Sequence, residues 1–238
     1  MTYQGKKVVI LGGGSGMGLA LAQKIVNLGG HVVIAGRNEA KLQAVADRLG
    51  AAVSVAAFDL GDEAAVKQAF ERIGGFDHLV STAAELTFAP VLELTTAQVQ
   101  AMLVSKFWGP FYAAKYAAPH LAKTGSITFF SGLAAYRPAP GASIVASLNA
   151  ALEGFAMTLA LELKPVRVNV VSPGVVDTPT WAFLGASDRQ GLFDSVAAGL
   201  PVGRVGQADE LADAALAMMG NGFINATVLH VDGGGRVA

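Results

Sequence analysis

Cysteine is absent from the 238-residue chain, and charge is scarce, because Asp, Glu, Lys and Arg together make up 15% of the residues. The missing cysteine excludes disulfide bonds, thiolate metal ligands and a cysteine nucleophile. The formal net charge is −1 and no basic run is present, so nothing predicts a nucleic-acid partner. Hydrophobic residues make up 53%, which excludes a disordered chain, since disorder requires low hydrophobicity and high charge.

Long uninterrupted apolar runs are also lacking. The stretch 150–161 is interrupted by Glu153 and Gly154 and falls short of the about 18 apolar residues that a membrane span needs. Residues 1–7 lead directly into a strand-like run and do not resemble a secretion signal. We therefore expect a cytoplasmic protein with no membrane span. The apolar excess favours a homo-oligomer, because a monomer rarely exposes so much apolar surface.

Two further kinds of catalytic site find no support in the sequence. No serine lies in a G-x-S-x-G turn, which disfavours an acyl-transfer hydrolase. The four histidines are scattered without metal-ligand spacing, so we expect no metal site; they are His31, His78, His120 and His230.

What the sequence does contain is an alternation of short apolar runs with longer amphipathic segments. We expect strands at 8–11, 31–35, 53–58, 79–81, 126–130, 166–171 and 228–231. We expect helices in the segment that ends at residue 28 and at 39–49, 62–73, 96–122, 144–163 and 208–219. Buried strands joined by helices indicate a parallel sheet covered on both faces. The prediction is an α/β fold: one single-domain, Rossmann-like, doubly wound parallel sheet of about seven strands.

The segment 177–205 is the least regular part of the chain, with prolines and glycines at its ends. An insertion of this kind near the carboxyl end of a strand covers the ligand crevice of an open α/β sheet. Trp181 and Phe183 in this segment either line an apolar substrate pocket or serve only in packing.

A glycine-rich turn follows the first predicted strand. Glycine permits a sharp strand-to-helix turn and lets backbone N–H groups approach a pyrophosphate at the helix N-terminus. The alternative is a glycine-rich loop without a ligand. The strand–turn–helix setting favours a dinucleotide site, and its predicted residues are Gly12, Gly14, Ser15, Gly16, Met17 and Gly18.

The end of the second strand indicates which dinucleotide binds. An acidic residue would favour a free ribose hydroxyl, but Arg37 and Asn38 stand there instead. An arginine suits a 2′-phosphate, so we expect NADP(H) rather than NAD(H); the alternative is a solvent-exposed arginine. Asp59, after the third strand, is a candidate for the adenine edge. Its alternative role is helix capping, for which Asp62 competes.

With these residues in view, the chain resembles the short-chain dehydrogenase/reductase family along nearly its full length. The glycine turn is similar to the family's T-G-x-x-x-G-x-G, with Leu11 in place of threonine. Asp59-Leu60 matches its adenine-contacting pair. The segment 168–174 resembles V-N-x-x-x-P-G, and the segment 231–234 resembles V-D-G-G.

This resemblance implies a seven-stranded sheet, a nicotinamide cofactor and a small-molecule substrate. It also implies a homodimer or homotetramer built on the two long central helices. Thr178 falls where a threonine of the family bonds the nicotinamide amide. The further cofactor-binding residues that it implies are Leu60, Ala83, Pro173, Gly174 and Val176.

The catalytic positions depart from the family. Its tyrosine and its lysine, four residues apart on one helix, align with Val145 and Asn149. Its serine aligns with Gly132, one position after Ser131. The family's N-N-A-G loop reads S-T-A-A at 81–84. Tyr3 and Lys7 have the Y-x-x-x-K spacing but precede the first strand, so the pair is not a candidate.

Two of the departures are complementary. Lys106 takes the position of the family's asparagine, and Asn149 takes that of its lysine. We hypothesise that Lys106 restores an ammonium near the nicotinamide ribose from the neighbouring helix. The alternative is that Lys106 is solvated or paired at an interface.

The proton donor remains open among four candidates. Ser131 ends the fifth strand, Tyr136 follows it in a loop, and Glu85 follows the fourth strand. Lys106 qualifies if burial depresses its pKa. The alternatives are a backbone bond for Ser131, surface packing for Tyr136 and solvation for Glu85.

The sequence therefore predicts an NADP(H)-dependent oxidoreductase that reduces a small carbonyl or oxidises the alcohol, with an altered proton donor. The predicted catalytic residues are Lys106, Ser131, Tyr136 and Asn149. The alternative is a catalytically inactive nucleotide-binding or scaffold homologue that kept the fold but lost the tyrosine and lysine.

Overall fold

The computed structural model describes residues 2–238, and in them the expected parallel sheet is present. Its strands are β1 (Lys7–Leu11), β2 (His31–Gly36), β3 (Val53–Ala57), β4 (Phe76–Ser81), β5 (Leu121–Phe130), β6 (Arg167–Pro173) and β9 (Val228–Val231). These seven strands lie in the order β3-β2-β1-β4-β5-β6-β9, and every neighbouring pair is parallel. A separate short pair joins β7 (Val176–Asp177) to β8 (Gly206–Gln207).

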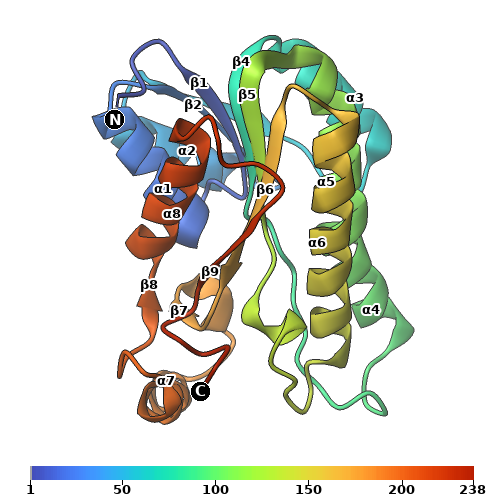
Figure 1. Cartoon of the computed structure of the whole chain (residues 1–238), viewed down its shortest axis with the longest axis vertical. Helices are drawn as coiled ribbons and strands as arrows, with labels where there is room; N and C mark the ends of the chain where they lie inside the picture. Colours follow the sequence, from blue (N-terminus) through green and yellow to red (C-terminus); the bar gives the residue numbers. More distant parts are fainter. Residues whose placement is uncertain (1) are drawn as a thin grey trace.

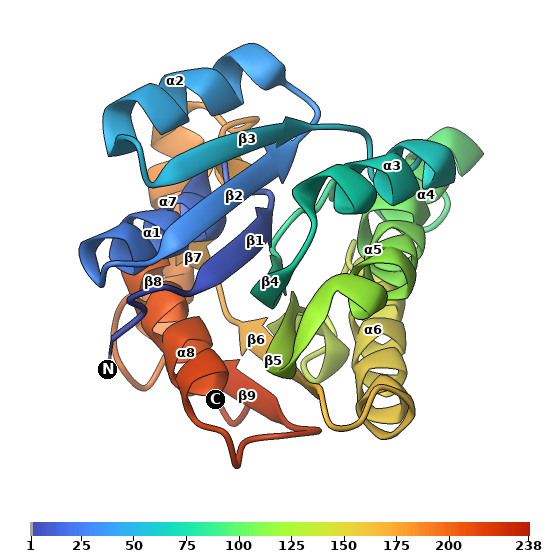
Figure 2. The ribbon, with the colours of Figure 1, turned by 90° about the horizontal axis from the view of Figure 1, so that it is seen from above.

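Helices cover both faces of the sheet, as Figures 1 and 2 show. One face packs against α1 (Gly16–Asn27), α2 (Glu39–Leu49) and α8 (Ala208–Gly220). The other face packs against α3 (Glu63–Ile73), α5 (Gly109–Ala117) and α6 (Ser143–Glu162). Two helices lie toward the carboxyl ends of the strands, at the bottom of Figure 1: α4 (Thr96–Leu103) and α7 (Ala186–Gly199).

Strand β1 explains why continuous apolar runs form this sheet. Side chains of a strand alternate between its two faces. Val9 and Leu11 belong to the core on the α3/α5/α6 face, whereas Val8 and Ile10 belong to the core on the α1/α2/α8 face. All four are buried, so alternation of polar and apolar residues is absent and the run reads as uniformly hydrophobic.

Polar side chains fix where several helices begin. The Asn38 side chain accepts a hydrogen bond from the backbone N–H of Lys41, at the start of α2. Asp62 accepts one from Ala65 at the start of α3. Such caps satisfy N–H groups that have no partner within the helix. They also set the angle at which each chain segment leaves the carboxyl end of its strand.

The predicted helix over 96–122 is interrupted. Between α4 and α5 lies a π-helical segment, Val104–Trp108, in which the N–H of Gly109 bonds the carbonyl of Val104. Pro110 has no N–H with which to reach the carbonyl of Lys106, which removes one regular α-helical bond at this place. After α5 the chain makes a single 3₁₀ turn and enters β5 at Leu121, five residues earlier than expected.

The segment 177–205 also differs from the expectation of irregular structure, because it contains α7. Only Phe193 of this helix is buried. A helix that buries so little of itself has no strong apolar period, and the sequence pattern therefore gave no signal for it.

One helix among residues 2–238, α6, is long and apolar enough to cross a membrane by length and composition alone, with a mean hydropathy of 1.6 over 18 residues. In the fold it lies on the sheet, and Leu152, Ala156 and Leu159 pack into the core. Core helices of this kind pass the same test, so the feature is weak evidence for a membrane span.

Candidate functional site

The strand order reverses between β1 and β4, and open α/β sheets bind ligands at such a point, beyond the carboxyl ends of the strands. A cavity of about 1020 Å³ lies there. Its wall includes nearly all the site residues predicted from the sequence: Gly12, Gly14, Ser15, Gly16, Met17, Arg37, Asn38, Asp59, Leu60, Ala83, Lys106, Ser131, Asn149, Pro173, Gly174, Val176 and Thr178. Among the described residues, Gly18 and Tyr136 are the predicted ones that do not line it.

The glycine turn is shaped by close backbone contacts. Gly12 and Gly16 have positive φ angles of 85° and 52°, which favour glycine. A Cβ on Gly12 would lie 2.8 Å from the backbone nitrogen of Ala83, and one on Gly18 would lie 2.4 Å from the carbonyl oxygen of Gly12. The role of Gly18 is therefore to let α1 pack against the turn, while the other glycines leave the backbone open to the cavity.

At one end of the cavity, Arg37 forms an ion pair with Glu85, with 3.1 Å between Nη2 and Oε2. Both side chains are exposed, and both line the cavity. Lys41 lines it as well and adds a second cation. Sequence reasoning missed Lys41, although its place in the first turn of the helix after Arg37 was a usable signal.

The two candidate roles for Asp59 are resolved by its neighbour. Asp62 caps α3, so the capping role is filled. The Asp59 carboxylate accepts a bond from the N–H of Gly61 at 2.8 Å and remains on the cavity wall beside Leu60. The predicted adenine-contacting position is thus open to a ligand.

The segment after β6 closes the cavity on another side. Thr178 is buried, and a Cβ on Gly16 would lie 3.4 Å from its Cβ, so the threonine stands beside the glycine turn. A Cβ on Gly174 would lie 2.9 Å from the Cα of Asp232. The V-D-G-G segment therefore packs behind the P-G turn and supports it from outside the cavity.

Lys106 lies in the π-helical segment and is 4% exposed. Its Nζ donates hydrogen bonds to the carbonyl oxygens of Phe130 at 2.9 Å and Ser131 at 3.1 Å. Burial lowers the pKa of Lys106 to about 8, and the attraction of Glu153 opposes that shift. The alternative of a solvated lysine is wrong, because this ammonium is buried in the cavity wall at the end of β5.

Asn149, on α6, is 2% exposed and also lines the cavity. Its Nδ2 donates a long bond of 3.4 Å to the carbonyl of Gly132. Its buried Oδ1 has no hydrogen-bond partner among the described residues. Leaving a buried acceptor without a hydrogen bond costs folding free energy. Because Asn149 lies on the cavity wall, a bound ligand could donate the missing hydrogen bond.

The hydroxyl groups of Ser131 and Tyr136 converge on Glu153, which is 8% exposed on α6. Ser131 Oγ donates to Oε1 at 2.6 Å, and Tyr136 donates to Oε2. The ring of Tyr136 packs edge-on against His230, outside the cavity lining. Burial and the Glu153 carboxylate raise the pKa of Tyr136 to about 12.

This arrangement bears on the predicted proton donors. Within the described residues Tyr136 does not line the cavity, and its hydroxyl is hydrogen-bonded to Glu153. The hydroxyl of Ser131 donates its hydrogen bond to Glu153. The carboxylate of Glu85 forms an ion pair with Arg37. Sequence reasoning missed Glu153, although a single carboxylate within the apolar stretch 150–161 was a signal.

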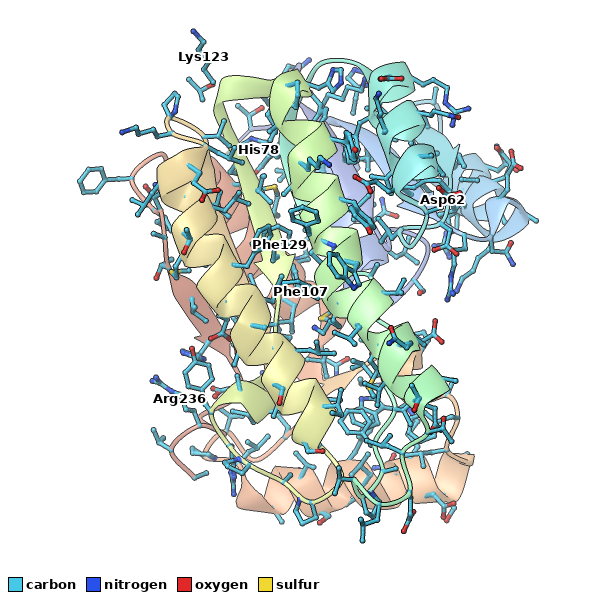
Figure 3. The ribbon with its side chains drawn as sticks, turned by 90° about the vertical axis from the view of Figure 1, so that its right-hand side faces the viewer. Asp62, His78, Phe107, Lys123, Phe129 and Arg236 are labelled. Carbon is cyan, nitrogen blue, oxygen red and sulfur yellow. The ribbon has the colours of Figure 1, made fainter. Side chains whose placement is uncertain are left out.

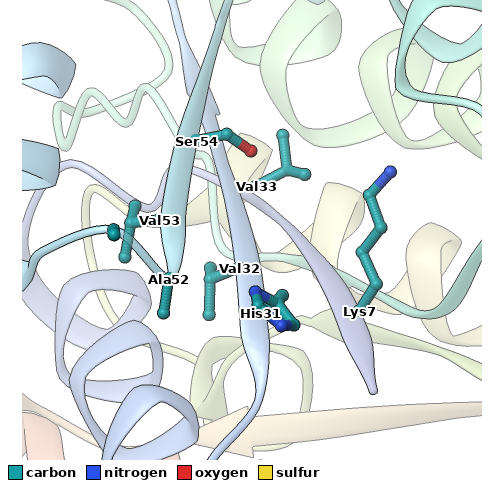
Figure 4. Close-up of a pocket in the computed structure, with 8 residues that line it drawn as sticks. Lys7, His31, Val32, Val33, Ala52, Val53 and Ser54 are labelled. Atoms are coloured by element: carbon teal, nitrogen blue, oxygen red, sulfur yellow. The ribbon is translucent and has the colours of Figure 1, made fainter. Parts of the chain in front are cut away.

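A second, smaller depression of about 370 Å³ lies at the opposite ends of β1, β2 and β3 (Figure 4). Its wall includes Lys7, His31 and Ser54. The amine of Lys7 donates to the carbonyl of Ile73, and Figure 4 shows it pointing away from the imidazole of His31. These polar groups do not converge, so the larger cavity is the candidate site.

Known proteins share this fold and sequence over their whole length. The sequence profile of the family described as enoyl-(acyl carrier protein) reductase matches residues 12–235. The short-chain dehydrogenase/reductase malC of Malbranchea aurantiaca is 32% identical over 97% of this chain and 94% of its own. The 3-oxoacyl-(acyl-carrier-protein) reductase FabG of Chlamydia muridarum is 31% identical over 96% of each chain.

A crystal structure of a small-chain dehydrogenase in complex with NADPH superposes with a TM-score of 0.86, at 33% identity, over 98% of this chain and 99% of that one. The likeness therefore covers nearly the whole of both chains. Sequence, family profile and structure agree that this chain belongs to the short-chain dehydrogenase/reductase family of oxidoreductases.

Proposed function

We propose that the protein is an NADP(H)-dependent oxidoreductase that reduces a small carbonyl compound or oxidises the corresponding alcohol, with Lys106 as the proton donor. The observation that carries this proposal is the buried ammonium of Lys106 on the wall of the cavity. Val145, at the position of the family's tyrosine, has no proton to give.

The residues present fit a nicotinamide dinucleotide phosphate. The open backbone of the glycine turn and the start of α1 suit a pyrophosphate, and the cations of Arg37 and Lys41 suit a 2′-phosphate. Asn149 Oδ1 is buried without a partner and could accept a hydrogen bond from a ribose hydroxyl. Thr178 lines the same cavity, and the family resemblance assigns it the hydrogen bond to the nicotinamide amide. When bound, the nicotinamide supplies or accepts the hydride.

One of the three N–H groups of the Lys106 ammonium has no acceptor among the described residues. Of its three N–H groups, two are directed to the carbonyls of Phe130 and Ser131. A pKa of about 8 keeps Lys106 protonated at neutral pH while making it a stronger acid than an ordinary lysine. The third proton is therefore suited to neutralise the oxygen of a reduced carbonyl, and the neutral amine is suited to take a proton from an alcohol.

Lys106→Met and Lys106→Arg test this role. Methionine keeps the length of the side chain without charge or proton, and arginine keeps the charge but does not release a proton near neutral pH. We expect both variants to slow single-turnover oxidation of NADPH by a ketone by about 10²–10⁴-fold, the usual value of acid catalysis. NADPH binding, followed by fluorescence titration, should persist in both. Unchanged turnover and unchanged NADPH affinity in Lys106→Met would overturn the proposal.

The second candidate, an inactive nucleotide-binding homologue, is supported by the apolar Val145, which is 3% exposed, and by the absence of a side chain at Gly132. It predicts that NADPH binds and that no ketone is reduced at any pH. Titration of NADPH followed by a turnover assay separates the two candidates, because only the oxidoreductase consumes the bound NADPH.

We further propose a homo-oligomer formed through the two central helical segments. Trp108, at 43% exposure, and Leu161, at 71%, leave apolar surface uncovered on the π-helical segment and on α6. Analytical ultracentrifugation of the native chain, compared with Leu161→Glu, measures this assembly. The cytoplasmic location of the protein stays a prediction from the sequence.

A further inference from the structure

Part of the cavity wall consists of residues other than those assigned to the nucleotide, and this part is called the substrate compartment below. Its wall is largely apolar and is contributed by Leu86, Phe88, Leu133, Ala134, Ala142, Val145, Pro179, Trp181, Val196 and Leu200. Polar side chains there include the hydroxyls of Thr180 and Ser195 and the guanidinium of Arg137. Arg137 donates one hydrogen bond to the carbonyl of Gly235 at 2.8 Å, which links this side chain to the C-terminal segment.

An aromatic pair joins two separate segments at this compartment. The ring of Phe88, in the loop after β4, stacks on the indole of Trp181, after β7, with centroids 5.7 Å apart and planes 20° apart. Trp181 Nε1 donates to the carbonyl of Val176 at 3.1 Å, which anchors the indole to β7. Phe88 has no such anchor and is 40% exposed.

From this wall we infer that the substrate is an uncharged, largely apolar ketone or aldehyde carrying a ring, or the corresponding alcohol, and that Phe88 and Trp181 hold the ring. This inference rests on the proposed function, because it places the carbonyl oxygen at Lys106. The carbonyl is then the one polar group of the substrate that finds a strong donor.

Polar and charged substrates fit this wall poorly. A polyhydroxylated sugar would bury hydroxyl groups against Leu, Val and Ala side chains, where few partners exist for them, and unpaired buried hydroxyls weaken binding. A carboxylate or phosphate on the substrate would lose its hydration against the same apolar side chains, and burying a charge in this way is costly. Apolar rings, in contrast, gain favourable contact with the aromatic pair.

Tryptophan fluorescence gives a direct test without turnover. The chain has two tryptophans, so Trp108→Phe leaves Trp181 as the only reporter. With NADP⁺ present, this variant is titrated with decalone, an apolar bicyclic ketone, and with cyclohexanone carboxylate, a charged one. We expect a saturable change in Trp181 emission with decalone, at an affinity at least about tenfold higher than that of the charged ketone.

Two variants locate the binding. Phe88→Ala in the same background should weaken decalone binding by about 2–10-fold, the range for loss of one aromatic contact. Phe183→Ala is the matched control, because its ring lies 6.3 Å from Trp181 but is 67% exposed and does not belong to the cavity lining. Decalone affinity should not change in that control.

Equal affinity for the charged ketone, no saturable response to decalone, or an unchanged affinity in Phe88→Ala would each overturn the inference. NADPH binding is measured separately by its own fluorescence. If NADPH binds and decalone does not, the substrate class is wrong and the cofactor assignment stands; if NADPH does not bind, the proposed function itself fails.

Discussion

Gly132 and Asn149 show that the departures from the family pattern depend on one another. A Cβ on residue 132 would lie 2.9 Å from Asn149 Nδ2, so any side chain there would force Asn149 to move. With glycine at 132, Asn149 keeps its Oδ1 buried on the cavity wall. Restoring a serine at residue 132 alone would therefore disturb the amide instead of rebuilding the usual site.

In the proposed NADPH complex, the 2′-phosphate would compete with Glu85 for the guanidinium of Arg37. Because both side chains are exposed, the pair is worth at most about 1 kcal/mol. We expect Glu85→Gln to tighten NADPH binding by up to about fivefold and to leave NADH binding unchanged. Fluorescence titration with both nucleotides checks this.

The matched control for that prediction is Glu93→Gln, an exposed carboxylate of the same connection after β4. It removes the same charge at a distance from Arg37 and should change neither affinity. Equal tightening of NADPH and NADH in Glu85→Gln would point to a general charge effect and against competition for Arg37.

Glu153 supports the end of β5 through two hydroxyl donors. Glutamine presents one acceptor and one donor in place of two acceptors, so Glu153→Gln sets its NH₂ against the hydroxyl of Ser131 or Tyr136. We expect a loss of about 1–3 kcal/mol in the free energy of unfolding, measured by urea denaturation. Tyr136→Phe, which removes the hydroxyl of a 40% exposed residue, should cost less. The opposite ranking would mean that Glu153 is not the centre of this network.

At the scale of elements, the junction of β1 and α1 depends on Gly18. A methyl group there would lie 2.4 Å from the Gly12 carbonyl oxygen and 2.6 Å from Thr82 Oγ1, and the Gly12 backbone cannot retreat without opening the turn. We expect Gly18→Ala to destabilise the fold by about 1–3 kcal/mol, the usual cost of overpacking, and to weaken NADPH binding. Thermal and urea unfolding measure the first effect.

Gly191, within α7, provides the contrasting substitution. A Cβ there meets nothing within 4 Å, so Gly191→Ala should stabilise the chain by up to about 1 kcal/mol through helix propensity alone. If both alanines destabilised the protein to the same degree, the steric explanation for Gly18 would fail.

The elements differ in how far sequence predicts them, for physical reasons. β1 and β2 are buried on both faces and therefore appear as apolar runs. In α7 only Phe193 is buried, so no periodic signal exists. The π-helical segment depends on Pro110 and on how two helical faces pack, and a local pattern does not encode the second of these.

The candidate site divides in the same way. The glycine turn, Arg37 and Thr178 are predicted from motifs, and the structure places them on the cavity wall. The pairing of Glu153 with Ser131 and Tyr136 joins residues from three elements, which spacing along the chain does not reveal. The burial of Lys106 follows only from the assembled fold.

At the scale of the whole molecule, stability should depend on pH through His78, at the amino-terminal half of β4 (Figure 3). Burial lowers the pKa of His78 to about 4, while the nearby Asp77 opposes and Arg167 and Lys6 reinforce the shift. Its Nδ1 lies 2.8 Å from Ser126 Oγ. Between pH 6.5 and about 4 the unfolded chain binds a proton that the folded chain does not, so acid favours unfolding.

The expected loss of unfolding free energy from this group is about 2 kcal/mol on going from pH 7 to pH 5. His78→Gln should lack that part of the pH dependence. His31→Gln, which replaces an exposed histidine, should keep it. Urea denaturation of the three proteins at both pH values provides the comparison, and an identical slope in His78→Gln would exclude His78 as the source.

The π-helical segment Val104–Trp108 has a consequence for how the chain tolerates insertions and deletions. One residue advances a helix by about 100°, so the extra residue in this turn sets the phase between α4 and α5. Deleting any one residue here would allow a continuous α-helix, but Met102 and the Ala113/Ala117 face could no longer both point inward. The core on either side thus holds the irregular turn in place, and with it the inward direction of Lys106.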